Sequence, residues 1–532
     1  MMTRTDTSAP VQDDLFKVML RDLVAKGHEL VLLRDAIDWR RFEEALAPAY
    51  SGDNGRPSAP VRMMAGLTFL KYMFALSDQD VLDNWCENPY WQYFCGGEFF
   101  EHEPPTDQAT MSRWRSRAGE AGAKEMVMET LASAVRNKVA KKKDFERVNV
   151  DTTVAEKNIR FPTDARTLDR ARERVVAVGG RLGIRFGHSY VRKGKTMLRR
   201  HSGYVKAKQF NRAANVVRAM RQYLGNVADD AEEALKSIVP RNAREMALAE
   251  QLKGLLGTSR RLAAQDKDTP GRDKIYPVHE PQVECIAKGK AHKRYEFGVK
   301  AGYVTASRAN WVLGAMALPG NPYDGNTLAQ MLREAEEVSG VRPRHACCDL
   351  GYRGHDYKGD CDVQIVNRFR KRKPRCVLRW WKRRSAIEPV IGHIKSDRYM
   401  ERNMLGGELG DKINAVFSAV GFNLVKLMKG LKKRWLRRLF CAFRRRWVVS
   451  PPAPHVSSNW LRWRLFARRL FCVACQDAQT GVLHNRLSNF HMMRKRFAEG
   501  HGTCRGQEGV RGDGRQERQV RREGRKGRRI KG

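Results

Sequence analysis

Short strand-like runs alternate with helical segments between residues 147 and 366, and this alternation constrains the fold more than any other feature. Runs rich in β-branched and apolar residues are typical of strands, and they predict strands at 147–154, 295–305, 311–318, 345–350 and 362–366. The turn signal Asn-Pro-Tyr-Asp-Gly at 321–325 precedes a predicted helix at 326–338. Strands and helices that alternate in this way favour an α/β class fold, in which helices pack on a mixed sheet.

Long helical segments surround and interrupt this pattern. Apolar residues recur at three- and four-residue spacing in the first part of the chain, which predicts an all-helical N-terminal domain at 1–137, with helices at 15–25, 39–46 and 61–76. A basic linker is predicted at 138–146. The mixed sheet is then assigned to a domain at 147–435, with a helical insertion at about 155–275 after the first strand.

A basic helix is predicted near the end of the N-terminal domain. Asp107 is a suitable N-cap for a helix that carries Arg113, Arg115 and Arg117. One interpretation is a helix-turn-helix-like contact with DNA. The other is an ordinary solvated basic face, and the sequence does not decide between them.

The chain of 532 residues has 101 Lys+Arg against 59 Asp+Glu, a formal net charge of +42. A hydrophobic content of 42% excludes a wholly disordered chain. So large a positive charge indicates a polyanionic partner, either nucleic acid or an anionic membrane surface. Acids outnumber bases in residues 1–110, so the middle and the C-terminal part carry the positive charge.

The membrane alternative has little support in the sequence. Residues 1–10 contain no apolar core of a secretory signal, and the best apolar stretch, 415–428, is too short to span a bilayer. The 11 scattered cysteines are typical of a reducing compartment rather than a disulfide framework. We therefore expect a cytoplasmic protein that associates with nucleic acid.

Three acids are candidates for a metal-dependent site. Asp151 lies in the first predicted strand, Asp349 ends the apolar run before Gly351, and Glu388 lies near a helix start marked by Pro389. Clustered carboxylates repel one another unless cations neutralise them, and Mg²⁺ prefers hard oxygen ligands. Two such ions can activate a hydroxyl and stabilise the leaving oxygen of a phosphodiester.

Each acid also has a purely structural interpretation. Asp151 could simply end a strand, and Asp349 could be a turn residue. Ser385 and Glu388 have the spacing of a helix capping box, in which the glutamate bonds only a backbone amide.

Basic and aromatic residues surround the third acid. The run 368–384 is dense in Lys and Arg and includes Trp380 and Trp381, a combination suited to phosphates and exposed bases. The alternative is a solvated charge run with tryptophans in the core. Lys395 lies two helical turns after Glu388 and shares its face.

Five motifs together resemble bacterial insertion-sequence transposases of the DDE type, group five. They are Asp151-Thr-Thr-Val, the run 283–292, the turn 319–325, Asp349-Leu-Gly-Tyr-Arg-Gly and the segment 384–395. The similarity extends in order from about residue 15 to about residue 435.

The resemblance implies an RNase H-like core, recognition of terminal inverted repeats, DNA cleavage and strand transfer with two Mg²⁺ or Mn²⁺ ions, and a homodimer on DNA near the nucleoid. By position, Asp151, Asp349 and Glu388 match the catalytic and metal-binding acids. Arg384 and Lys395 match the basic residues of the family's Tyr-Arg-Glu-Lys signature, and Trp381 replaces its tyrosine. The expected DNA contacts are Arg384, Lys395, Lys382, Arg383, Trp381, Arg113, Arg115 and Arg117.

Residues 436–532 do not share the resemblance, and their basic, biased composition predicts a disordered tail. It is either a nonspecific DNA-binding extension or sequence appended by a frameshift or readthrough. The sequence as a whole predicts a DNA transposase. Its alternatives are an inactive inverted-repeat-binding relic or repressor, and an RNase H-like nuclease that cuts without joining.

Overall fold

The computed structural model describes residues 18–50, 58–266, 268–287, 293–366 and 374–449, with side chains to residue 442. Contacts divide the chain into a first unit, Met1–Ala442, and a second, Phe443–Gly532. Almost all of the second unit lies outside the described residues. The predicted tail from residue 450 and the first part of the basic run, 367–373, also lie outside them.

Helices make up the N-terminal part of the first unit. They are α1 (Leu20–Leu23), α2 (Glu29–Ala36), α3 (Arg40–Leu46), α4 (Val61–Phe74), α5 (Asp78–Glu87), α6 (Pro89–Cys95) and α7 (Gln108–Arg136). Asp107 caps α7 as predicted, since its carboxylate accepts a hydrogen bond from the Thr110 N–H at 2.5 Å. The helix predicted at 15–25 is wrong in its extent: α1 stops before Val24, whose backbone is extended.

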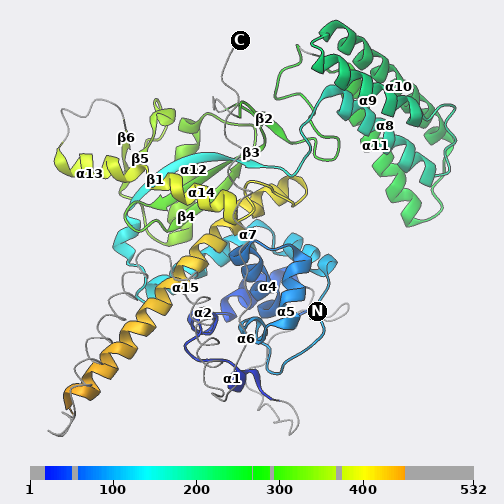
Figure 1. The fold of residues 1–532 in the computed structure, drawn as a ribbon. Helices are drawn as coiled ribbons and strands as arrows, with labels where there is room; N and C mark the ends of the chain where they lie inside the picture. The colour runs from blue at the N-terminus through cyan, green and yellow to red at the C-terminus, as the bar shows by residue number, and fades with distance from the viewer. Residues whose placement is uncertain (1–17, 51–57, 267, 288–292, 367–373, 450–532) are drawn as a thin grey trace, which may run out of the picture. The chain divides into compact units, whose positions relative to one another are not determined.

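A six-stranded mixed sheet follows, and Figure 1 shows its strands together. The strands are β1 (Arg147–Glu156), β2 (Glu284–Ile286), β3 (Glu296–Ala306), β4 (Val312–Leu318), β5 (His345–Cys348) and β6 (Asp362–Ile365). β1 pairs antiparallel with β3 and parallel with β5; β2 and β4 both pair antiparallel with β3, and β6 runs parallel to β5. The five strands predicted from the sequence are confirmed, and β2 was not predicted.

Helices cover both faces of the sheet. Val148 and Val150 of β1 share a core cluster with α12 (Asp324–Ser339), whereas Ala155 belongs to a second cluster with α14 (Ile387–Asp397). Because side chains alternate along a strand, Asp151 lies on the same face as Ala155, toward α14. Two further helical segments belong to this region, α13 (Arg375–Arg384) and α15 (Gly407–Val449).

Helix α15 connects the sheet to the N-terminal helices. Ala415 and Ala419 pack in the cluster with α14, while the ring of Phe417 lies 5.2 Å from that of Tyr72 on α4. A Cβ at Gly421 would collide with the Tyr72 carbonyl, so glycine permits this close approach. The helix continues to Val449 without a break at the expected domain limit near residue 435. Among the described residues, no helix is long and apolar enough to cross a membrane.

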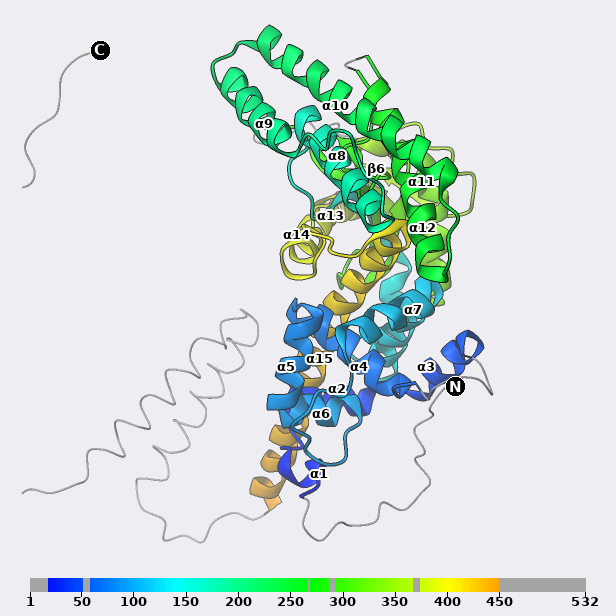
Figure 2. The ribbon, with the colours of Figure 1, turned by 90° about the vertical axis from the view of Figure 1, so that its right-hand side faces the viewer.

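The segment between β1 and β2 forms a helical bundle with its own core. Its helices are α8 (Asp164–Arg181), α9 (Val191–Lys206), α10 (Phe210–Ser237) and α11 (Ala243–Ala264), which stay together in both views (Figures 1 and 2). Leu168, Val175, Leu224 and Leu252 are among the buried residues of its cluster. These four helices lie within the insertion expected at about 155–275.

Candidate active site

Two of the predicted acids lie close together because β1 and β5 are parallel neighbours in the sheet. Asn149 is the register partner of Cys347, so Asp151 and Asp349 each lie two residues further along their chains. Asp349 directly follows β5 and accepts a hydrogen bond from the Gly351 N–H at 2.9 Å. The predicted turn role of Asp349 is thus confirmed, and it does not prevent the carboxylate from joining a site.

One arginine joins all three predicted acids. Arg384 ends α13, and its Nη2 lies 3.1 Å from Asp151 Oδ2 and 3.3 Å from Asp349 Oδ2. Its Nη1 lies 2.8 Å from Glu388 Oε1, one helical turn further along the chain. The structure therefore brings the three acids to one guanidinium, although they are far apart in the sequence.

The capping-box interpretation of Glu388 is wrong. Helix α14 begins at Ile387 after Ala386 and has no side-chain cap. Ser385 Oγ donates instead to the Lys382 carbonyl, and the Glu388 carboxylate accepts from Arg384. The glutamate is therefore directed toward the acid cluster rather than toward the helix terminus.

The donor chemistry of the cluster fits a divalent cation. Carboxylate oxygens are the ligands that Mg²⁺ prefers, and a positive guanidinium already lies among the three acids. In the described part of the chain, no three Asp, Glu, His or Cys side chains are arranged around a common point as a metal site requires. The position among the three acids is taken by the Arg384 guanidinium.

Thiols next to the cluster are not candidates for catalysis. Burial raises the pKa of Cys347 to about 12, and it also raises the pKa of Cys348 well above its usual value. Both side chains therefore stay protonated near neutral pH, and a thiol is a weak nucleophile and metal ligand in that form.

A fourth acid near the cluster was not predicted as a site residue. Asp324 Oδ1 accepts hydrogen bonds from Thr152 Oγ1 at 2.9 Å and from Lys300 Nζ at 3.1 Å. A Cβ added at Gly351 would lie 3.1 Å from Asp324 Oδ2 and 3.0 Å from Asp349 Oδ1, which shows how close the two acids are. From the sequence, Asp324 is predicted only as part of a turn signal.

Basic residues on α13 and α14 occupy different environments. Lys382 is exposed, whereas Arg383 donates to the Ser307 and Arg308 carbonyls of the β3–β4 turn. Trp381 is only 5% exposed, and Lys395 Nζ lies 3.6 Å from a Glu296 carboxylate oxygen. The contacts that these residues are expected to make with DNA stay predictions.

The N-terminal arginines also differ from one another. Arg115 is 5% exposed and forms a bidentate ion pair with Asp78 at 2.8 and 2.7 Å. Burial by itself raises the pKa of Asp78, but the hydrogen bonds from Arg115 and the charge of Lys71 outweigh burial and hold this pKa below its usual value. Arg113 is exposed, and the Arg117 guanidinium lies 4.6 Å from the Tyr50 ring centroid. Arg115 thus stabilises the interior of the N-terminal helices.

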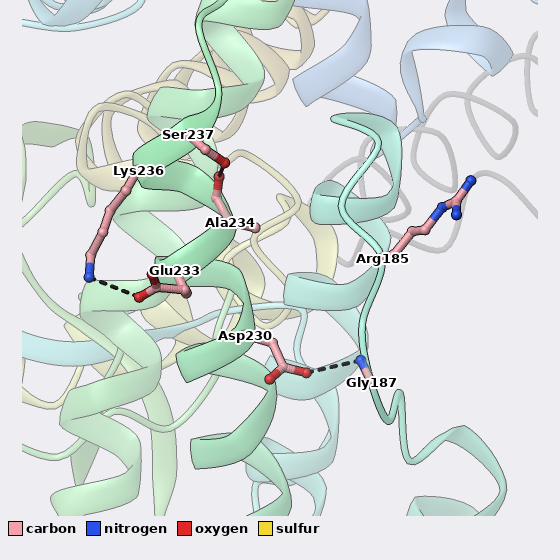
Figure 3. Close-up of a pocket in the computed structure, with 7 residues that line it drawn as sticks. All are labelled: Arg185, Gly187, Asp230, Glu233, Ala234, Lys236 and Ser237. Carbon is pink, nitrogen blue, oxygen red and sulfur yellow. Dashed lines mark hydrogen bonds and ion pairs between the residues drawn. The ribbon is translucent and has the colours of Figure 1, made fainter.

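A polar hollow lies away from the acid cluster, within the helical bundle. Its lining includes Arg185, Asp230 and Glu233, and the Gly187 N–H donates to Asp230 at 3.2 Å. Figure 3 shows the Arg185 side chain pointing away from Asp230, while Lys236 pairs with Glu233. None of the predicted site residues lines this hollow.

Two comparisons with known proteins find a match. Residues 18–117, which cover most of the N-terminal helices, match the family described as Transposase domain (DUF772). The chain is 41% identical over 199 residues to the uncharacterized protein ORF8 in the nfe locus of Rhizobium meliloti, an alignment that covers 37% of this chain and 96% of that protein. No solved structure matches the chain.

Proposed function

Because the chain belongs to a transposase family, we propose that it is a DDE-type DNA transposase with an RNase H-like core. It would bind the terminal inverted repeats of an insertion sequence, cleave DNA there and join the 3′-hydroxyl ends to target DNA. The observation that carries the proposal is the meeting of Asp151, Asp349 and Glu388 at Arg384. The order of antiparallel β4, β3 and β1 followed by parallel β5 and β6 supports the RNase H-like core.

Asp151, Asp349 and Glu388 are the residues that would hold Mg²⁺ or Mn²⁺. When bound, divalent cations supply charge neutralisation at the scissile phosphate and lower the pKa of an attacking hydroxyl. The three acids are suited to hold such cations because their negative charges repel one another when no cation neutralises them.

The protein residues contribute position and charge. Asp151 is held by its central strand and is 16% exposed, whereas the Glu388 side chain is 59% exposed at the start of α14. The glutamate therefore has the freedom to turn when DNA binds. Arg384, once released from the acids, is placed to bind a phosphate oxygen of the DNA end.

Two ends must be joined in one event, so we propose that the chain acts as at least a homodimer on DNA. Its positive charge is consistent with that partner, since Lys and Arg contacts to phosphates dominate DNA affinity. Cytoplasmic location at the nucleoid follows from the same proposal.

The central experiment compares the wild-type chain with Asp349→Asn on labelled DNA that carries the element's own ends, with Mg²⁺ and a target plasmid. We expect cleaved and joined products from the wild-type chain. Asp349→Asn should retain end binding but lose both products, because a neutral amide is a poor ligand for a divalent cation.

Asp356→Asn is the matched control, because Asp356 is an exposed acid seven residues from Asp349. It should leave both products at the wild-type level. Cleavage without joining by the wild-type chain would favour a nuclease, and end binding without cleavage would favour a binding relic. Wild-type activity in Asp349→Asn would refute the site assignment.

A further inference from the structure

Charge is strongly segregated within the helical bundle. Between Glu173 and Asp229 the sequence contains no Asp or Glu. The same stretch contains the basic residues Arg174, Arg181, Arg185, Arg192, Lys193, Lys195, Arg199, Arg200, Lys206, Lys208, Arg212, Arg218 and Arg221. This segment forms the end of α8, all of α9 and the first half of α10. Like charges at such density oppose folding unless an anion binds to them.

The basic residues of α9 and early α10, here called the basic hairpin (residues 191–221), lie on the solvent side. Arg192, Lys195, Arg199 and Lys206 follow the spacing of one helix face and are all exposed. At about 1.5 Å per residue, this stripe is about 21 Å long. At about 3.4 Å per phosphate along one strand, it matches about six phosphates of duplex DNA.

The apolar side of the hairpin is partly covered. Met197, Leu198 and Tyr204 of α9 are partly buried against the core of the bundle, and Val216 and Met220 of α10 belong to that core, whereas Val191 and Val205 are exposed. An amphipathic helix that binds a membrane needs a free apolar face. Because much of this face packs on the bundle, the hairpin favours a nucleic acid over a lipid surface.

The acids of the bundle lie elsewhere and have their own partners. Arg260 of α11 pairs with Asp229 and Glu232 in the second half of α10 at 2.5 and 2.6 Å. Lys236 pairs with Glu233 at 2.9 Å, as Figure 3 shows. Among the described residues, no ion pair is recorded for the exposed bases of the basic hairpin, so their charges are open to phosphates.

The turn between the two helices adds an apolar group to the basic surface. Phe210 is 65% exposed at the start of α10, close in sequence to Lys206, Lys208 and Arg212. Exposed aromatic rings beside basic residues are suited to contact bases or sugars at the edge of a groove.

We propose that the basic hairpin binds the sugar–phosphate backbone of duplex DNA, with Phe210 at its tip against the groove. This surface is separate from the acid cluster, and the inference rests on the proposed function, since DNA is the partner in both. The contact is sequence-independent, because phosphates carry no sequence information. It increases the affinity for the DNA molecule that is cut at the acid cluster, and it fixes the position of that DNA along the protein.

The test uses the full chain and a triple variant of exposed hairpin residues, Arg192→Gln, Lys195→Gln and Arg199→Gln. Duplex DNA binding is followed by fluorescence anisotropy over a range of salt concentrations. Each lost phosphate contact reduces the slope of log K against log salt by about 0.9, so the triple variant should lose about 2.7. Between about 200 and about 50 mM salt, its affinity should then rise about 40-fold less than that of the wild-type chain.

A matched control removes the same charge from another part of the same bundle. Exposed Arg241, Arg244 and Lys253 lie on or beside α11 and are replaced by Gln together. This control should keep the wild-type slope within about one contact. Equal slopes for the two triple variants would overturn the proposal.

A crosslinking experiment locates the surface directly. A photoreactive phenylalanine analogue at Phe210 should crosslink to DNA, whereas the same analogue at Val239, which is 81% exposed, should not. Crosslinks at both positions or at Val239 alone would contradict the assigned tip.

Binding to other partners is measured by the same titration. Loss of binding to duplex RNA or to phosphatidylserine vesicles by the hairpin variant, with an unchanged DNA slope, would overturn the DNA assignment. Cleavage is scored on the same DNA with Asp349→Asn. If the hairpin variant loses the expected salt slope but Asp349→Asn still cleaves, the proposed function alone is refuted. If Asp349→Asn abolishes cleavage but the hairpin variant keeps the slope of its control, only the hairpin proposal is refuted.

Discussion

Replacing Arg384 by Gln removes the cation that holds the acid cluster together. Arg384 and Asp151 are each 16% exposed, and breaking a pair of that burial costs up to about 3–5 kcal/mol. Asp349 and Glu388 are 39% and 59% exposed, so their pairs contribute only about 0–1 kcal/mol each. Because water reaches part of the cluster, we expect the variant to lose about 2–3 kcal/mol of unfolding free energy without metal.

The same change should strengthen the binding of divalent cations. In the wild-type chain a metal must displace the guanidinium from Asp151, Asp349 and Glu388, whereas in Arg384→Gln no guanidinium competes with it. If the displaced pairs are worth about 2–3 kcal/mol, Mn²⁺ affinity should rise by roughly 30-fold or more. Mn²⁺ should then restore much of the stability lost by the variant.

The assays are urea unfolding with a chelator or with Mn²⁺, and calorimetric titration of Mn²⁺ into each protein. Arg383→Gln is the control, because this neighbouring arginine bonds the Ser307 and Arg308 carbonyls rather than acids. It should lose stability without a gain in Mn²⁺ affinity. Equal Mn²⁺ affinities for the two variants would refute the reasoning, since they would show that Arg384 does not compete for the carboxylates.

Three further predictions concern other parts of the chain. Gly194→Ala should destabilise the bundle by about 1–3 kcal/mol because its Cβ would collide with Asp169. Gly203→Ala on the same helix has open space around the new Cβ and should stabilise the helix by up to about 1 kcal/mol. Thermal unfolding measures both changes. Arg115→Gln should cost about 2–3 kcal/mol in urea unfolding, because the partly buried Asp78 carboxylate loses its bidentate partner but keeps Lys71, while DNA affinity per folded molecule stays unchanged; a loss of affinity would favour the direct-contact interpretation. Burial lowers the pKa of Lys426 from 10.5 to about 8. The unfolded chain therefore binds this proton more tightly, and the free energy of unfolding rises as the pH increases between those two values. Lys426→Met should remove that rise and gain roughly 1–3 kcal/mol at pH 7, and an unchanged pH profile would refute it.

Local patterns in the sequence are sufficient for most elements of the fold. The β-branched run at 147–154 predicts β1, and the Asn-Pro-Tyr-Asp-Gly turn predicts the start of α12 closely. Asp107 as the cap of α7 is predicted because capping depends only on neighbours in the chain. The short strand β2 was missed, since three residues have too little periodicity to detect.

The candidate site was only partly accessible from the sequence. The resemblance selected Asp151, Asp349 and Glu388, but residue spacing alone left each of them with a structural interpretation. Nothing in the sequence indicated that Arg384 would contact all three acids or that Asp324 would lie beside Asp349. The buried ion pair of Arg115 with Asp78 was equally hidden, because the basic neighbours of Arg115 in the sequence do not indicate it.

The sequence by itself determined five of the strands, several of the helices, where charge accumulates and which residues have the chemistry of a metal site. These properties depend on residues a few positions apart, whose periodicity and composition are visible in one dimension. Only the tertiary structure decided that β5 lies parallel beside β1, which brings Asp349 close to Asp151. It also decided that Met197, Leu198 and Tyr204 of α9 pack against the bundle core while the basic side of this helix is exposed. Such choices are made by long-range strand pairing and helix packing, whose partners no local pattern identifies.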